Sequence, residues 1–133
     1  MSDKILIDTS AFYALVSASD EFHPKAKAIY GRLVDQKVEL YTSSYIFVES
    51  AALIQHRLGF PALKTFVESL KESLHFLWID GRTHWQAWEI LKETPERRLS
   101  FVDCTTVVLA KALGATVFAF DEDFRQQNIP LLH

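Results

Sequence analysis

Short apolar runs alternate along the chain with longer stretches in which apolar residues recur every three or four positions. The short runs have the length and branching of buried strands, and the longer stretches have the period of amphipathic helices. Strands are predicted at 4–7, 38–44, 75–79, 116–120 and 129–132, and helices at 11–18, 24–36, 45–58, 61–73, 83–93, 101–113 and 122–127. This alternation predicts an α/β fold with a central, mainly parallel sheet of four to five strands covered by helices.

Glycine and proline mark several ends of these elements. Gly59 and Gly114 follow two of the predicted helices, where glycine is favoured as a helix terminator, and Pro61 opens the next helix. Pro130 restricts the last strand to a sheet edge, because proline has no N–H for a central ladder. No linker or repeat interrupts the pattern, so a single domain spanning residues 1–133 is predicted.

Aspartates recur where strands end and helices begin. Asp8 follows the first strand, Asp121 follows the fourth, and Asp103 lies in the first turn of helix 101–113. Ligands of parallel α/β sheets bind beyond the carboxyl ends of the strands, so these carboxylates could meet in one crevice. Asp80, after the third strand, is a further candidate by position. For any one aspartate alone, helix capping is the favoured interpretation, since a cap contributes about 0.5–2 kcal/mol.

Glu49 does not fit the capping interpretation, because it lies in the middle of a predicted helix. The neighbours on its face are apolar or aromatic: Tyr45, Ile46, Ala52 and Leu53. Its carboxylate is therefore expected to be partly desolvated. A buried carboxylate normally requires a cation, a network of hydrogen-bond donors or a metal nearby.

Several acids without a matching buried base predict a divalent cation. The carboxylates would otherwise repel one another and raise their own pKa values. An all-carboxylate ligand set suits Mg²⁺ or Mn²⁺ and not zinc, and such ions commonly serve phosphoryl chemistry. The net charge is −3, which gives no global positive field for nucleic acid. Bound cations would nevertheless make the acidic pocket a phosphate-binding one, so a phosphodiester substrate is predicted.

The remaining chemistry-bearing residues favour structural interpretations. Cys104 is the single cysteine and is expected to be a small core residue in a chain suited to a reducing cytoplasm. The five histidines show no metal-binding spacing, so each is interpreted as a surface or hydrogen-bonded histidine. Packing against the sheet or a dimer partner is expected for Trp85 and Trp88. Neither a signal peptide nor a membrane span is visible.

Four segments together resemble the PIN-domain ribonucleases, especially the VapC-like toxins of toxin–antitoxin pairs. They are "ILIDTSAFYAL", "SSYIFVESA", "LSFVDCTTVVLAKALGA" and "TVFAFDEDFRQQNIPLL", in this order and over essentially the whole chain. The resemblance implies a three-layer α/β/α fold and a Mg²⁺- or Mn²⁺-dependent endonucleolytic cut of RNA. By position, it implies that four acids are catalytic and bind the metal: Asp8, Glu49, Asp103 and Asp121. It places Asp123 at a variable fifth acidic position and Ser10 at the position of a hydroxyl residue that orients water or phosphate.

The resemblance also implies partners, and the chain departs from the family at one position. A homodimer is expected, with aromatic residues on the helices after strands two and three as its contact, together with a small antitoxin protein and an RNA substrate. Arg97 and Arg98, in the loop before the Asp103 helix, are the best candidates for RNA-phosphate contacts. The family commonly has Thr or Ser two residues before the final aspartate, where this chain has Ala119.

Two other classes of function remain open from the sequence. One is a catalytically silent PIN fold that binds RNA or protein. The other is a receiver-like signalling module, which also places aspartates at strand ends but normally has a paired acid at the first strand and a lysine after the last. An aspartate-nucleophile phosphatase is disfavoured, because Ser10 replaces its usual second aspartate.

Overall fold

The computed structural model describes residues 3–94 and 98–133, and it contains every predicted element. The ends of the elements differ from the sequence prediction by two residues at most, and the last helix is a 3₁₀ helix. In chain order the elements are β1 (Lys4–Ile7), α1 (Thr9–Val16), α2 (His23–Asp35), β2 (Glu39–Ser43), α3 (Ser44–Leu58), α4 (Phe60–Ser73), β3 (His75–Leu77), α5 (Gly81–Glu93), α6 (Phe101–Leu113), β4 (Thr116–Phe118), η2 (Glu122–Gln127) and β5 (Leu131–Leu132).

The five strands form one parallel sheet in the order β3-β2-β1-β4-β5. The chain builds outward from β1 to β2 and β3, and then returns to add β4 and β5 on the other side. The topological switch point therefore lies between β1 and β4, where open α/β sheets bind their ligands. Receiver domains have the strand order 2-1-3-4-5, so the receiver-like alternative is wrong for this chain.

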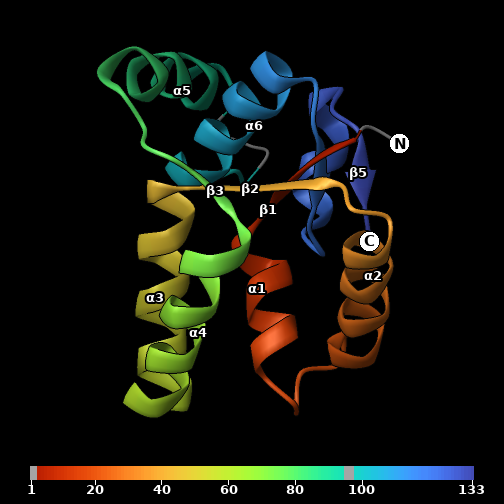
Figure 1. Cartoon of the computed structure of the whole chain (residues 1–133). Helices are drawn as coiled ribbons and strands as arrows, with labels where there is room; N and C mark the ends of the chain where they lie inside the picture. Colours follow the sequence, from red (N-terminus) through yellow and green to blue (C-terminus); the bar gives the residue numbers. More distant parts are fainter. Residues whose placement is uncertain (1–2, 95–97) are drawn as a thin grey trace.

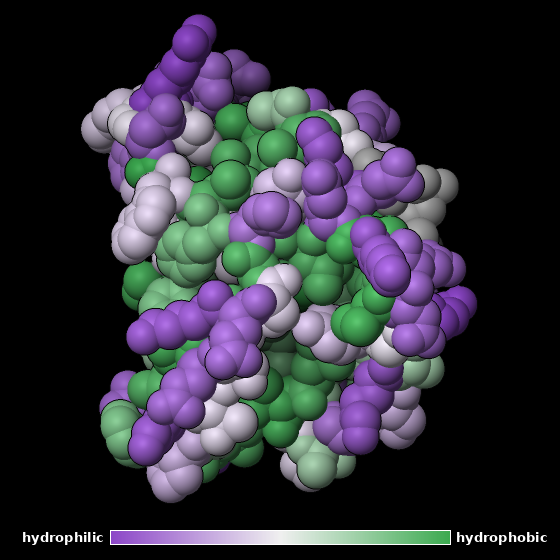
Figure 2. Space-filling model, in the orientation of Figure 1, coloured by the Kyte–Doolittle hydropathy of each residue, from purple (hydrophilic) through white to green (hydrophobic). Residues whose placement is uncertain are grey.

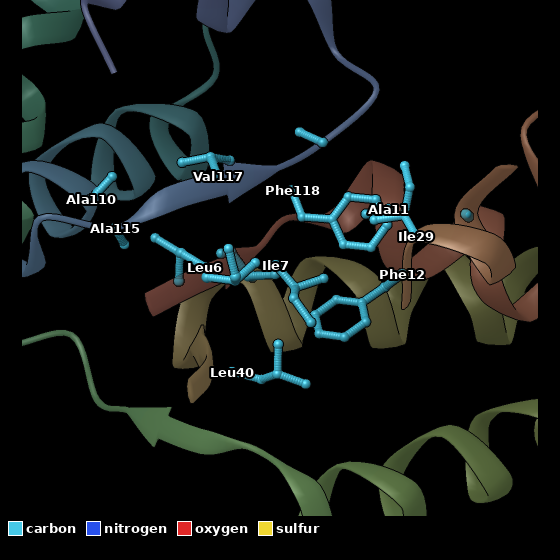
Figure 3. Packing of buried hydrophobic residues seen from close by; sticks show 14 of the residues in the cluster. Leu6, Ile7, Ala11, Phe12, Ile29, Leu40, Ala110, Ala115, Val117 and Phe118 are labelled. Carbon is cyan, nitrogen blue, oxygen red and sulfur yellow. The ribbon is translucent and has the colours of Figure 1, made fainter. Parts of the chain in front are cut away.

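Helices cover both faces of the sheet, which confirms the predicted three-layer α/β/α arrangement. In Figure 1, α5 and α6 lie on one side of the sheet, and α1, α2, α3 and α4 lie on the other. Strand β1 is central, and Ile5, Leu6 and Ile7 are completely buried. Figure 3 shows Leu6 and Ile7 gathered with residues of β4 and α1 in the main core.

An apolar groove of about 580 Å³ lies between α1, α2 and α4. Its lining includes Phe12, Val16, Tyr30, Phe66 and Leu70, and Figure 2 shows hydrophobic residues exposed along the middle of this face. Among the described residues, no acidic residue, histidine or cysteine lines the groove. In the described part of the chain, no helix is both long and apolar enough to cross a membrane.

Candidate functional site

The structure brings the four predicted acids together in one pocket of about 650 Å³. They come from the end of β1, the middle of α3, the first turn of α6 and the N-cap of η2, three residues after β4. The pocket is lined by Asp8, Thr9, Ser10, Glu49, Ala52, Leu53, His56, Ser100, Asp103 and Asp121. Because β1 and β4 are neighbours in the sheet, the pocket lies at the switch point.

Asp8 caps α1, but only one of its two carboxylate oxygens is used for this. Oδ2 accepts hydrogen bonds from the Ser10 backbone N–H at 3.3 Å and from the Ser10 hydroxyl at 3.2 Å. Oδ1 is buried and has no hydrogen-bond partner among the described residues. Burial, reinforced by the negative charges of Asp103 and Glu49, raises the pKa of Asp8 to about 7. Capping therefore accounts for Oδ2 and leaves Oδ1 as a buried oxygen without a partner among the described residues.

Asp103 also combines a capping role with a place in the pocket. Its carboxylate accepts a hydrogen bond from the Ser100 N–H at 3.0 Å, and the Ser100 hydroxyl accepts one from the Asp103 N–H, which forms a capping box. Burial raises the pKa of Asp103 to about 6 against the opposing effect of the Ser100 bond, and the charges of Asp121 and Glu49 add to the rise. Burial likewise raises the pKa of Asp121, which caps η2 by accepting from the Asp123 N–H.

Asp80 is the N-cap of α5. Its side chain accepts a hydrogen bond from the Thr83 N–H at 2.8 Å, and it is exposed. This bond lowers the pKa of Asp80, the opposite direction from Asp8 and Asp103. Strand β3 pairs with β2 at the far edge of the sheet, so Asp80 lies outside the pocket. Its candidacy by position was therefore wrong.

Hydroxyl groups tie the elements of the site to one another. The Ser10 hydroxyl donates to Asp8 and accepts from the Phe120 N–H at 2.9 Å, which links the end of β1 to the segment that carries Asp121. The Ser50 hydroxyl, one residue after Glu49, donates to the Thr9 hydroxyl oxygen at 3.1 Å and fixes α3 against α1. Ala119 is completely buried in the core, so the link through Ser10 forms without a hydroxyl at position 119.

The composition of the pocket fits a hard divalent cation. Its ionisable groups are four carboxylates and one histidine, and among the described residues no Lys or Arg lines it. The unpartnered Asp8 oxygen is an available ligand atom of the kind that Mg²⁺ and Mn²⁺ prefer. The described residues contain no group of three or more acids, histidines or cysteines that is already arranged to hold a metal. The carboxylates thus share a pocket without forming a finished coordination sphere.

A family model for the PIN domain matches residues 5–129. This chain belongs to the PIN domain family. The resemblance drawn from the four sequence segments is thereby confirmed, together with the α/β/α fold that it implied.

Proteins of similar sequence and fold include a 23S rRNA-specific endonuclease. The 23S rRNA-specific endonuclease VapC20 of Mycobacterium tuberculosis is 30% identical over 122 residues, covering 90% of this chain and 91% of VapC20. The crystal structure of VapC20, described as a Sarcin-Ricin loop cleaving toxin, superposes with a TM-score of 0.86 at 28% identity and covers 94% of this chain and 95% of that one. VapBC2 from Rickettsia felis, bound to a DNA fragment from its promoter, superposes with a TM-score of 0.73 at 14% identity over 97% of both chains, a likeness of fold alone.

The sequence analysis missed one pocket residue of this PIN domain that carries chemistry. His56 is exposed, as a surface histidine should be, but it also lines the acidic pocket. The available signal was its spacing of seven residues from Glu49, which places both on one face of the helix.

Three other predicted site residues lie outside the pocket lining or outside the described structure. Asp123 does not line the pocket, and its backbone N–H supports Asp121 instead. Arg98 is exposed and does not line the pocket, while Arg97 lies outside the described residues. Their contacts with RNA phosphates stay a prediction.

Proposed function

We propose that this PIN domain is a divalent-metal-dependent endoribonuclease that hydrolyses RNA phosphodiester bonds. The observation that carries the proposal is the meeting of Asp8, Glu49, Asp103 and Asp121 in one pocket that no Lys or Arg of the described chain lines. Similarity to a ribosomal RNA endonuclease over 90% of the chain supports the same activity. The four carboxylates would hold one or two ions, with Mg²⁺ or Mn²⁺ as the proposed metal.

The metal ion and the residues of the pocket have different proposed roles in the reaction. A bound divalent ion supplies positive charge against the phosphate and makes water a better nucleophile. Asp8 and Asp103 hold their carboxylates at fixed positions, because each is hydrogen-bonded through one oxygen at a helix start. Ser10 keeps the Asp8 carboxylate oriented and holds the β4 end beside it. This fixed arrangement lets the site bind charge with little reorganisation during the reaction.

The proposed substrate is a structured RNA, and the proposed role is that of a VapC-like toxin. VapC20 is named for cleavage of 23S rRNA, and its crystal structure for cleavage of the Sarcin-Ricin loop. A ribosomal stem-loop is therefore the first substrate to test. An RNA-cleaving toxin meets its target in the cytoplasm, so the proposal includes a cytoplasmic location.

Removal of the metal is expected to abolish the activity. Purified protein incubated with a labelled RNA stem-loop should cleave it in Mn²⁺ or Mg²⁺ and should stop when EDTA is added, because four uncompensated carboxylates repel the phosphate. Gel electrophoresis of the RNA measures this. Cleavage that persists in EDTA contradicts the proposal, and no cleavage by a protein that binds Mn²⁺ favours the silent PIN fold instead.

The proposal includes a small antitoxin partner and a homodimer. Large apolar side chains stay exposed on α3 and near α5, with Val48 at 64%, Trp78 at 79% and Trp85 at 61% exposure. The Tyr45 hydroxyl and His84 Nδ1 lie 2.6 Å apart, which joins the start of α3 to α5 in one surface. Packing of Trp85 against the sheet is excluded by its exposure, and a dimer contact is the remaining prediction.

A negative charge introduced among the exposed apolar residues of α3 and α5 is expected to separate the dimer. Trp85→Glu and Val48→Glu should each shift the protein from dimer to monomer in light scattering at micromolar concentration, because a buried charge at an interface is strongly unfavourable. Phe60→Glu, an exposed aromatic at the start of α4, serves as the control and should leave the dimer intact. A wild-type monomer would contradict the dimer while leaving the nuclease proposal standing.

A further inference from the structure

His56 lies on the face of α3 that lines the acidic pocket. Glu49, Ala52, Leu53 and His56 are spaced as one helical stripe, and all four line the pocket. At a rise of about 1.5 Å per residue, the His56 Cα lies about 10 Å along the helix axis from that of Glu49. The imidazole therefore lines the same pocket about two helical turns along α3 from the Glu49 carboxylate.

Of the five histidines, His56 is the one without a partner among the described residues. His23 Nδ1 contacts the Ala14 carbonyl oxygen at 2.7 Å, and His84 Nδ1 contacts the Tyr45 hydroxyl. His75 stacks on the Tyr41 ring, and His133 has an interaction of its own. Both ring nitrogens of His56 are thus free to meet a ligand, and in either neutral tautomer one of them carries a hydrogen.

The hydroxyl oxygens that line the pocket each take part in a hydrogen bond within the protein. The Ser10 hydroxyl donates to Asp8, the Ser100 hydroxyl accepts from Asp103, and the Thr9 hydroxyl oxygen accepts from Ser50. Arg57, the next residue along α3, has its guanidinium 5.4 Å from the centre of the Tyr13 ring. An RNA strand entering this acidic pocket therefore finds one side-chain N–H donor among the described residues that line it, which is that of His56.

We propose that His56 is a substrate-contact residue whose imidazole N–H donates a hydrogen bond to an RNA phosphate next to the one held at the carboxylates. The inference rests on the proposed nuclease function and extends it to the binding of the strand. Its distance from Glu49 makes the contact one of binding and orientation. Cleavage of the phosphodiester bond is assigned to the four carboxylates and not to His56.

The test compares three substitutions at position 56 with one on the neighbouring residue. H56A removes the ring, H56F keeps an aromatic ring without an N–H, and H56Q keeps an N–H donor at similar reach. Gln55→Ala is the control, because Gln55 is exposed on the same helix and does not line the pocket. The values of kcat and KM are measured with a fluorescein-labelled RNA stem-loop in Mn²⁺, and circular dichroism checks folding.

The expected result is a KM about ten-fold higher for H56A and H56F, with kcat within two-fold of wild type. H56Q should recover most of the loss, and Gln55→Ala should behave as wild type. Unchanged KM in H56A, wild-type behaviour of H56F, or a loss confined to kcat would each overturn the phosphate contact.

A binding measurement separates failure of this inference from failure of the proposed function. Fluorescence anisotropy with the same RNA compares D8N with the double variant D8N/H56F, and needs no turnover. A weaker Kd in the double variant supports the contact even where wild type does not cleave, in which case only the nuclease proposal fails. Equal Kd values overturn the contact whether or not wild type is active.

Discussion

Asp8→Asn is expected to lower kcat/KM for RNA cleavage by about 10²–10³-fold or more, and Asp103→Asn to do the same. Each substitution removes a negative oxygen from the pocket and replaces it with an amide that binds a divalent ion poorly. Each also preserves the hydrogen bonds at its helix start. Asparagine serves as an N-cap as well as aspartate does at position 8, and its amide oxygen at position 103 can still accept from the Ser100 N–H in the capping box. The loss should therefore appear in activity and not in folding, with initial rates measured in Mn²⁺ on a labelled stem-loop.

Asp80→Asn is the matched control for this experiment. Asp80, like Asp8, follows a strand and caps the next helix, but it is exposed and outside the pocket. Its substitution should leave kcat/KM within two-fold of wild type. Equal loss in all three variants would attribute the effect to capping or folding, and full activity of Asp8→Asn would remove this residue from the catalytic set.

The contrast between Asp8 and Asp80 shows where sequence reasoning reaches its limit. Local patterns place both residues at a strand end and helix start, and both positions are correct. What separates them is the order of strands in the sheet, which depends on pairings between distant segments. Strand β3 pairs with β2 at an edge, whereas β1 is central and pairs with β4. The acid after β1 consequently shares a pocket with Asp103 and Asp121, whereas the acid after β3 is exposed to solvent.

Glu49 was found from sequence because its neighbours on the helix are apolar, and a mid-helix carboxylate among them needs an explanation. Asp103 was ambiguous from sequence, and the structure shows that its carboxylate closes a capping box and also lines the pocket. Its role in metal binding stays a prediction. The unpartnered oxygen of Asp8 could not be foreseen, because it depends on which atoms of α3, α6 and β4 surround it. The exposure of Trp85 could not be predicted from sequence either, because the apolar pattern of one helix does not show which other elements pack against it.

The second large effect is expected in the stability of the metal-free protein. Asp8→Asn should stabilise the chelator-treated protein at pH 8, because it removes a buried negative charge that is repelled by Asp103 and Glu49. The pKa of Asp8 is about 7 in the folded protein and 3.8 as its ordinary value. The folded state therefore holds this proton more tightly than the unfolded chain does.

The sign of the pH dependence follows from this difference. The contribution of Asp8 to stability is greatest below its ordinary pKa and is lost progressively as the pH rises through about 7. Between pH 5 and pH 8 the advantage of Asp8→Asn over wild type should grow by about 2–3 kcal/mol. Thermal unfolding in EDTA should show this as a Tm difference that widens by roughly 5–12 °C over the same range.

Metal should reverse the order of the two proteins. Saturating Mn²⁺ binds the folded wild type in preference to the unfolded chain and raises its Tm, more at pH 8 than at pH 6, because ligand carboxylates must be deprotonated. Asp8→Asn should gain little from Mn²⁺ at either pH, and Asp80→Asn should follow wild type throughout. An Asp8→Asn protein that is less stable than wild type at pH 8 in EDTA would show that the Asp8 carboxylate stabilises the fold. The unpartnered oxygen would then have to be satisfied within the protein itself, and the case for a cation at this position would be lost.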